Sequence, residues 1–150
     1  MSQGTVLGPA LFNIYINDLI TFLQGECVVC YADDTVLIFE EATWDLAYKR
    51  AEKALQMAKF WFDKNILNLY ILKSHYMCFS FNCRNPPNLN KLTIHEISCN
   101  RNRLCSCCLS ISSVSNIKYL GIYFDSHLKW NKHIKYVSAK IRQTYFKFST

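Results

Sequence analysis

Two short apolar segments, at 26–30 and 35–39, flank a four-residue stretch, and this pattern predicts a β-hairpin. The residues between the segments are Tyr31, Ala32, Asp33 and Asp34. Adjacent aspartates at a turn are most often solvated turn residues. They are also suitable ligands for Mg²⁺, which binds one or two protein carboxylates together with water and substrate phosphates. The hairpin by itself leaves both interpretations open.

The composition is that of a folded protein and permits an anionic partner. Of 150 residues, 51% are hydrophobic and 19% are charged, which excludes an intrinsically disordered chain. The net charge is +6, and its distribution is uneven, because no acidic residue follows Asp125. The basic residues after that point are Lys129, Lys132, Lys135, Lys140, Arg142 and Lys147. They predict either a phosphate-contacting surface or a solvated helix face.

The sequence indicates an intracellular protein, in the cytoplasm or nucleus, that neither is secreted nor crosses a membrane. The longest uncharged apolar stretch, 5–17, is too short for a membrane span, and no secretory signal is visible. Eight cysteines in this context indicate reduced thiols. The candidate zinc ligands are Cys99, Cys105, Cys107 and Cys108, with His95 nearby. Their spacing matches no familiar zinc motif, and a loop with free thiols is the interpretation we favour.

Hydrophobic periodicity predicts an α+β fold. We expect helices at 8–23, from 43 to 64 and from 131 onward, and strands at 26–30, 35–39, 76–81, 92–94 and 117–124. The second helix has its apolar face at Ala47, Ala51, Ala54, Leu55, Ala58 and Phe62. Gly121 interrupts the last strand, which indicates a bulge or a close approach of another molecule. The expected arrangement is one antiparallel sheet with helices on one face and the aspartates on the other, open to a substrate.

Four blocks, in this order, resemble the reverse transcriptases of non-LTR (LINE-type) retrotransposons. The blocks are Gln3–Phe12 with Tyr15–Leu19, Tyr31–Asp34, Trp61–Ser74, and Ile117–Ile134. The resemblance covers nearly the whole chain except a variable loop near 82–113. It implies a partial polymerase palm at 1–125 and the basic helical start of a thumb at 126–150, without fingers. The implied activity is RNA-directed DNA synthesis, a Mg²⁺-dependent (or Mn²⁺-dependent) nucleotidyl transfer from a deoxynucleoside triphosphate to a primer 3′-hydroxyl.

The resemblance also implies roles for individual residues. Asp33 and Asp34 are the implied metal ligands, and the implied catalytic residues are Asp33, Asp34 and Lys73. The implied contacts for the template and nucleotide are Gln3, Gly4 and Tyr31, and those for the primer are Leu120, Gly121, Lys132 and Lys135. The implied partners are an RNA template, a DNA primer, the nucleotide and the remainder of a retrotransposon polyprotein. Without the resemblance, Lys73 is an ordinary surface lysine, Gln3 a residue of a frayed terminus and Tyr31 a packed strand residue.

One feature of the family has no counterpart in the matched blocks, and two positions depart from its usual residues. The palm of the family needs a further aspartate on a strand that precedes the glutamine-glycine block, and here that block begins at Gln3. Tyr70 stands where the family usually has asparagine, and Ser74 where it usually has threonine. We therefore expect a polymerase segment that is inactive by itself. The alternatives are a non-catalytic nucleic-acid-binding remnant and a relic that does not fold stably, so activity of this chain as an enzyme stays open.

Overall fold

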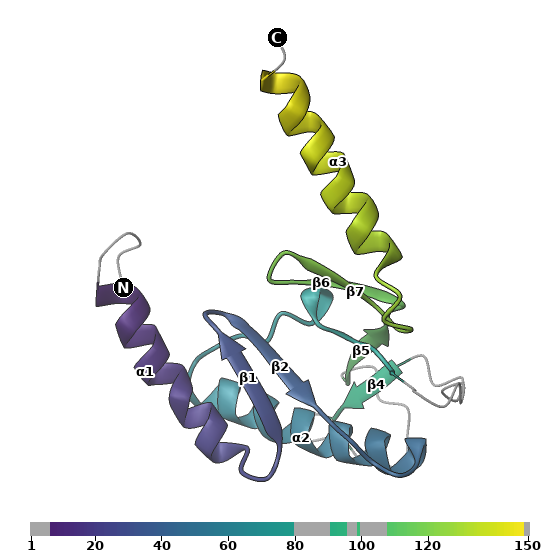
Figure 1. The fold of residues 1–150 in the computed structure, drawn as a ribbon. Coiled ribbons are helices and arrows are strands. Elements are labelled where there is room, and N and C mark those ends of the chain that lie inside the picture. Colours follow the sequence, from purple (N-terminus) through teal and green to yellow (C-terminus); the bar gives the residue numbers. More distant parts are fainter. Residues whose placement is uncertain (1–6, 80–90, 96–98, 100–107, 149–150) are drawn as a thin grey trace. The chain divides into compact units, whose positions relative to one another are not determined.

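The computed structural model describes residues 7–79, 91–95, 99 and 108–148 (Figure 1). In chain order the elements are α1 (Leu7–Phe22), β1 (Cys27–Tyr31), β2 (Asp34–Ile38), α2 (Trp44–Lys64), η1 (Ile71–Lys73), β3 (His75–Tyr76), β4 (Lys91–Ile94), β5 (Leu109–Ser113), β6 (Asn116–Tyr119), β7 (Ile122–Asp125) and α3 (Asn131–Phe148). A mixed α+β fold is thereby confirmed. None of the described helices combines the length and apolarity that crossing a membrane requires.

The chain forms two compact units. The first unit contains Met1–Ile71 and Leu92–Ser110, and the second contains Leu72–Lys91 and Ile111–Thr150. The hairpin with the two aspartates belongs to the first unit, and α3 belongs to the second.

Helix α2 is the long helix of the first unit, and its ends follow from local chemistry. The Thr43 side chain caps its start and accepts a hydrogen bond from the Leu46 amide at 3.4 Å. Asp45 lies in the first turn and Lys64 in the last, where each charge interacts favourably with the helix dipole. The buried residues of α2 are Ala51, Ala54, Ala58 and Trp61. The predicted small-residue face is confirmed, but Trp61 is buried where the sequence pattern placed Phe62, which is only half-buried.

The core of the first unit joins α1, α2 and the β1–β2 hairpin. Its buried residues are Ile16, Leu19, Leu23, Ala58 and Trp61. The Trp61 indole Nε1 donates a hydrogen bond to Asp18 Oδ2 at 3.3 Å, so the polar edge of this buried ring is satisfied. In Figure 1 the hairpin lies beside α1 and across α2. The predicted hairpin is confirmed, with β1 and β2 antiparallel and Cys27 paired with Ile38 at the open end.

The described strands form three small sheets, not the single antiparallel sheet that the sequence pattern predicted. One of these sheets has the strand order β3-β5-β4, and β3 pairs with β5 in parallel. Strand β3 is limited to His75 and Tyr76, so the strand predicted at 76–81 is confirmed at Tyr76 and wrong at 77–79. Strand β5 falls inside the predicted variable loop near 82–113.

In the second unit, β6 and β7 form an antiparallel hairpin. Leu120 and Gly121 are its two-residue turn, with φ angles of 47° and 85°. Two positive φ angles in succession match the turn twist that tight hairpins favour, and glycine adopts this region without strain. The prediction of one strand interrupted at Gly121 is therefore wrong, because the glycine reverses the chain.

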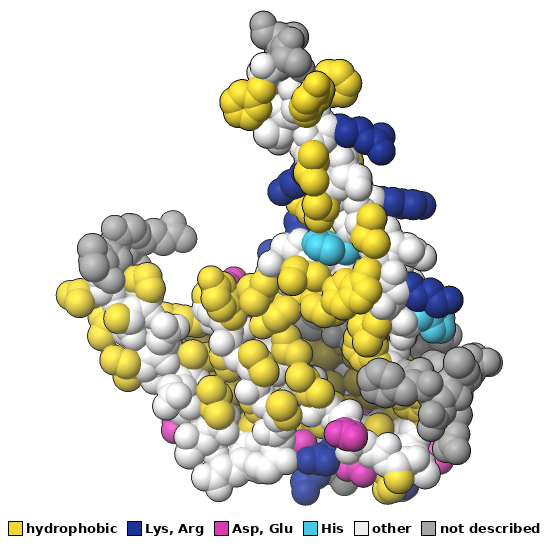
Figure 2. Space-filling model, in the orientation of Figure 1, with side chains coloured by type: hydrophobic (Ala, Val, Ile, Leu, Met, Phe, Trp, Pro, Cys, Tyr) yellow, Lys and Arg dark blue, Asp and Glu magenta, His cyan; other side chains and the backbone are white. Residues whose placement is uncertain are grey.

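Helix α3 packs against β7. It confirms the predicted C-terminal helix. Five large apolar side chains along this helix are exposed: Ile134, Val137, Ile141, Tyr145 and Phe148. Figure 2 shows hydrophobic side chains interspersed with lysine and arginine along this helix.

Helix α2 ends in a Schellman motif with an unusual residue at its left-handed position. The Leu67 amide donates a hydrogen bond to the Phe62 carbonyl at 2.9 Å, and the Ile66 amide donates one to the Asp63 carbonyl at 3.3 Å. Ile66 has a φ of 55° and is 95% exposed, so this β-branched residue occupies a strained conformation with little packing in return. Glycine is the residue that this position ordinarily takes.

We predict that Ile66→Gly raises the free energy of unfolding by about 0.5–1 kcal/mol. Removal of left-handed strain of about 1–2 kcal/mol outweighs the extra entropy of glycine in the unfolded chain. The measurement is urea denaturation followed by circular dichroism. Ile66→Ala is the control, because it keeps the strain and removes the same exposed side chain, and it should change stability by less than about 0.5 kcal/mol. Destabilisation by glycine would contradict this account of the helix end.

Candidate active site

The tip of the β1–β2 hairpin is a tight turn with a strained backbone. Tyr31 and Asp34 form the last pair of the ladder, and Ala32 and Asp33 are the two residues between them. Ala32 has a φ of 52°, in the left-handed region that alanine rarely adopts. Such strain costs about 1–3 kcal/mol and is found most often at functional sites. A two-residue hairpin turn requires a positive φ at its first central position, so the turn accounts for this angle, and alanine takes it where glycine is usual.

The two faces of the hairpin differ in burial. Val28, Cys30 and Leu37 pack on the core. Tyr31 lies on the opposite face and is 62% exposed, and its ladder partner Asp34 is exposed as well. The turn residue Asp33 is also exposed. The open face that we expected for Tyr31, Asp33 and Asp34 is therefore present, whereas their roles stay predictions.

Arg50 fixes the other end of the hairpin to α2. Its Nε bonds Glu26 Oε2, its Nη1 bonds Glu41 Oε1 and its Nη2 bonds the Gly25 carbonyl, each at 2.8 Å. The hydrogen bond with Glu41 and then that with Glu26 raise the pKa of Arg50 above its usual value. Gly25 and Glu26 precede β1 and Glu41 follows β2. One guanidinium therefore links the start of β1 to the segment that follows β2.

The two carboxylates at the tip are available to a ligand. Within the described part of the chain, neither the Asp33 nor the Asp34 carboxylate has a hydrogen-bond or ion-pair partner. Exposed carboxylate oxygens suit hard divalent cations such as Mg²⁺. Over the same residues, no third His, Cys, Asp or Glu side chain joins them into a three-ligand group. The tip thus provides a pair of donors that a cation would complete with water or substrate oxygens.

The remaining predicted residues fall in different parts of the chain. Gln3 and Gly4 lie outside the described residues. Lys73 is the last residue of η1, in the second unit, and is exposed. Leu120, exposed at 49%, and Gly121 form the β6–β7 turn. They were predicted to contact the primer together with Lys132 and Lys135, which belong to the same unit.

Lys132 and Lys135 line a hollow at the start of α3, with a volume of about 380 Å³. Asp125 organises the chain at this point, because its carboxylate accepts hydrogen bonds from the amides of Lys129 at 3.0 Å and Trp130 at 2.8 Å. These amide bonds, that of Lys129 first, hold the pKa of Asp125 below its usual value. The Asp125 carboxylate is therefore hydrogen-bonded to the backbone, and the lysine charges that line the hollow are those of Lys129, Lys132 and Lys135.

A group of lysines and tyrosines on β6, β7 and α3 was not anticipated from the sequence. We call it the Lys–Tyr surface; its residues are Lys118, Tyr123, Lys132, Tyr136 and Lys140. The two tyrosine rings meet edge to face at 5.0 Å. The Lys132 Nζ lies 5.2 Å from the Tyr123 ring, and the Lys140 Nζ lies 5.0 Å from the Tyr136 ring.

Charged and polar groups of the Lys–Tyr surface shift one another's pKa. Lys140, through a hydrogen bond and its charge, and Lys118 lower the pKa of Tyr136, and Tyr136 in turn raises the pKa of Lys140. The signal for this group was present in the sequence, because Lys132, Tyr136 and Lys140 are four residues apart and share one helix face.

Comparison with known proteins gives this geometry a context. Residues 1–124 match the family described as "Reverse transcriptase (RNA-dependent DNA polymerase)". The chain is 23% identical over 152 residues to the "Probable RNA-directed DNA polymerase from transposon X-element" of Drosophila melanogaster, which covers 93% of this chain and 14% of that protein. It is 23% identical over 148 residues to the "Probable RNA-directed DNA polymerase from transposon BS" of the same species, covering 94% and 15%. No solved structure matches the chain at a significant level.

The chain therefore belongs to the reverse transcriptase (RNA-dependent DNA polymerase) family. It spans about one seventh of the length of the two curated relatives. The matched region contains the β1–β2 hairpin and ends within β7.

Proposed function

We propose that this chain is a catalytic segment of the RNA-directed DNA polymerase of a non-LTR retrotransposon. The reaction is nucleotidyl transfer from a deoxynucleoside triphosphate to the 3′-hydroxyl of a DNA primer on an RNA template. The observation that carries the proposal is the β1–β2 tip, where Asp33 and Asp34 are exposed and unpartnered beside the strained Ala32. The similarity of the whole chain to two transposon polymerases supports the same assignment.

Members of this family generally use divalent metal ions, and Mg²⁺ (or Mn²⁺) fits the donors at the tip. Asp33 would bind the cation and Asp34 would contribute charge or a water-mediated contact, since both offer hard oxygen atoms to solvent. When bound, the cation supplies stabilisation of phosphoryl charge and alignment of the reacting oxygens. The protein positions these donors through the core beneath β1 and β2 and through Arg50 at the base of the hairpin.

The other assignments complete the proposal. Tyr31 would lie near the primer terminus, Gln3 and Gly4 would line the template and nucleotide pocket, and Lys73 would lie near the triphosphate and protonate the leaving group. The β6–β7 turn at Leu120 and Gly121, with Lys132 and Lys135, would contact the primer. Residues 1–125 would correspond to the palm and 126–150 to the start of the thumb, with the remainder of a polyprotein as the partner that completes the enzyme.

The described residues gather two oxygen donors at the tip and no third ligand. Mg²⁺ requires near-ideal octahedral coordination, and a pair of ions needs bridging carboxylates to hold it. We therefore propose that the 150-residue chain by itself does not support templated synthesis.

Primer extension on an RNA template tests this proposal. With Mg²⁺ or Mn²⁺ and all four nucleotides, the isolated chain should extend the primer no more than a protein-free reaction does, while a complete reverse transcriptase extends it in parallel. Extension that Asp33→Ala abolishes and the surface control Asp45→Ala preserves would contradict inactivity of the chain alone. It would at the same time locate the chemistry at the hairpin.

The Lys–Tyr surface favours a second function, binding of nucleic acid without catalysis. Cationic side chains over aromatic rings offer both phosphate contacts and stacking platforms. This function requires neither the metal nor the hairpin. It is therefore separable from polymerase activity in an experiment.

We predict that the chain binds a primer–template duplex with salt-dependent affinity and that replacing Lys132 and Lys135 together by glutamine weakens it. Each lost phosphate contact should reduce the slope of log affinity against log salt by about 1. The measurement is fluorescence anisotropy at several salt concentrations. The charge-matched control replaces Lys49 and Lys53, two exposed lysines of α2, by glutamine. Equal slopes for the two double variants would contradict phosphate contacts by Lys132 and Lys135.

A further inference from the structure

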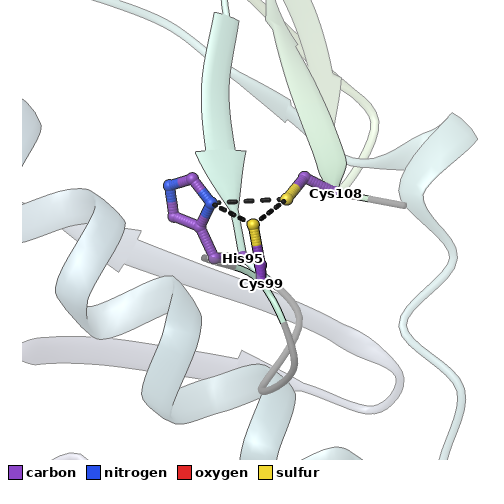
Figure 3. A group of neighbouring side chains, drawn as sticks. All are labelled: His95, Cys99 and Cys108. Atoms are coloured by element: carbon purple, nitrogen blue, oxygen red, sulfur yellow. Dashed lines mark hydrogen bonds between the residues drawn. The ribbon is translucent and has the colours of Figure 1, made fainter. Parts of the chain in front are cut away.

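We propose that His95, Cys99 and Cys108 form a binding site for Zn²⁺, separate from the hairpin and independent of polymerase activity. Figure 3 shows the imidazole and the two thiols pointing toward one another at the end of β4. All three residues belong to the first unit and are partly buried. The ligand class is a thiophilic divalent cation, for which zinc is the physiological representative.

The spacing of the three donor atoms fits a tetrahedral ion. His95 Nδ1 lies 3.3 Å from Cys108 Sγ and 3.7 Å from Cys99 Sγ, and the two sulfurs are 3.3 Å apart. A tetrahedral Zn²⁺ with bonds of about 2.3 Å to sulfur and about 2.05 Å to nitrogen places its ligands roughly 3.5–3.8 Å apart. The three atoms need to move by only a few tenths of an ångström to become ligands.

The backbone that carries His95 is fixed to α2 from both sides of the peptide. The Gln56 side chain donates from Nε2 to the His95 carbonyl at 2.5 Å, and its Oε1 accepts from the His95 amide at 2.8 Å. One turn earlier on α2, Glu52 Oε1 accepts from the Thr93 amide at 3.2 Å. Helix α2 thus holds the end of β4 in place before any ion binds, which reduces the conformational cost of binding.

The character of the donors distinguishes this site from the hairpin tip. Two thiolates and an imidazole select zinc over Mg²⁺, whereas the carboxylates of Asp33 and Asp34 have the opposite preference. Three protein ligands leave the fourth tetrahedral position to water or to another donor. The unfamiliar spacing, which argued against zinc in the sequence, is no obstacle, because Cys108 lies within 3.3 Å of both Cys99 Sγ and His95 Nδ1. Cys105 and Cys107 lie outside the described residues.

Titration with Co²⁺, a spectroscopic substitute for Zn²⁺, tests the site on the full 150-residue chain. The reduced, chelator-treated protein should bind one equivalent and develop a thiolate-to-metal charge-transfer band, and Zn²⁺ should displace the cobalt and abolish the band. Cys99→Ser, Cys108→Ser and His95→Ala should each raise the dissociation constant at least about tenfold, the loss typical of even an indirect contact to a metal ligand. Cys27→Ser is the control, because Cys27 is an exposed cysteine of β1 outside the group.

A second measurement does not depend on how the variants fold. X-ray absorption of the zinc-loaded chain should show two sulfur neighbours, with the remaining neighbours nitrogen or oxygen. Coordination by nitrogen and oxygen alone would overturn the proposal. So would equal loss of cobalt binding in Cys27→Ser and Cys99→Ser, or a Cys99–Cys108 disulfide that forms under reducing conditions and leaves no metal bound.

Discussion

The packing of α2 is the constraint on which the first unit depends. Ala58 and Trp61 of α2 lie in the core with residues of α1, and Val28, Cys30 and Leu37 of the hairpin pack against it. Polar side chains of the same helix also position other segments. Arg50 donates hydrogen bonds to the base of the hairpin, and Gln56 donates one to the backbone carbonyl of His95. Both candidate metal sites of this unit are therefore positioned by one helix.

The two sites are chemically distinct, which has a consequence for metal selectivity. The hairpin tip offers exposed carboxylates, to which Mg²⁺ binds weakly unless substrate phosphates complete its coordination. The group of His95, Cys99 and Cys108 offers nitrogen and sulfur, which bind Zn²⁺ without a substrate. The catalytic cation proposed for the tip and the zinc proposed for the His95 group would thus be selected by different donor atoms within one unit.

Local signals in the sequence were sufficient for the helices and for the first hairpin. The periodicity of α2 and the alternation around Tyr31–Asp34 both arise within one element, and both were predicted correctly. The role of Gly121 could not be inferred, because a bulge and a two-residue turn both favour glycine and the preceding Leu120 is unusual in such a turn. The parallel pairing of β3 with β5 was missed because it joins short segments that are far apart in the chain.

The candidate sites likewise divide into those with a local sequence signal and those that depend on contacts between distant segments. Asp33 and Asp34 are adjacent in sequence, so the pattern alone indicated them. The contact of Cys99 and Cys108 with His95 depends on how the chain returns to the end of β4, and no spacing rule predicts it. The Lys–Tyr surface lies between these cases, because its α3 members are visible as a four-residue repeat whereas Lys118 and Tyr123 come from the β6–β7 hairpin.

The central claim is that the carboxylates at the hairpin tip hold a divalent cation, and paramagnetic broadening by Mn²⁺ tests it most directly. In a two-dimensional amide NMR spectrum, substoichiometric Mn²⁺ should broaden the signals of residues 31–34 before any others. Asp33→Asn should remove this broadening, and Asp45→Asn should leave it unchanged. Broadening that begins elsewhere in the chain, or that persists in Asp33→Asn, would contradict the assignment of the tip as the metal site.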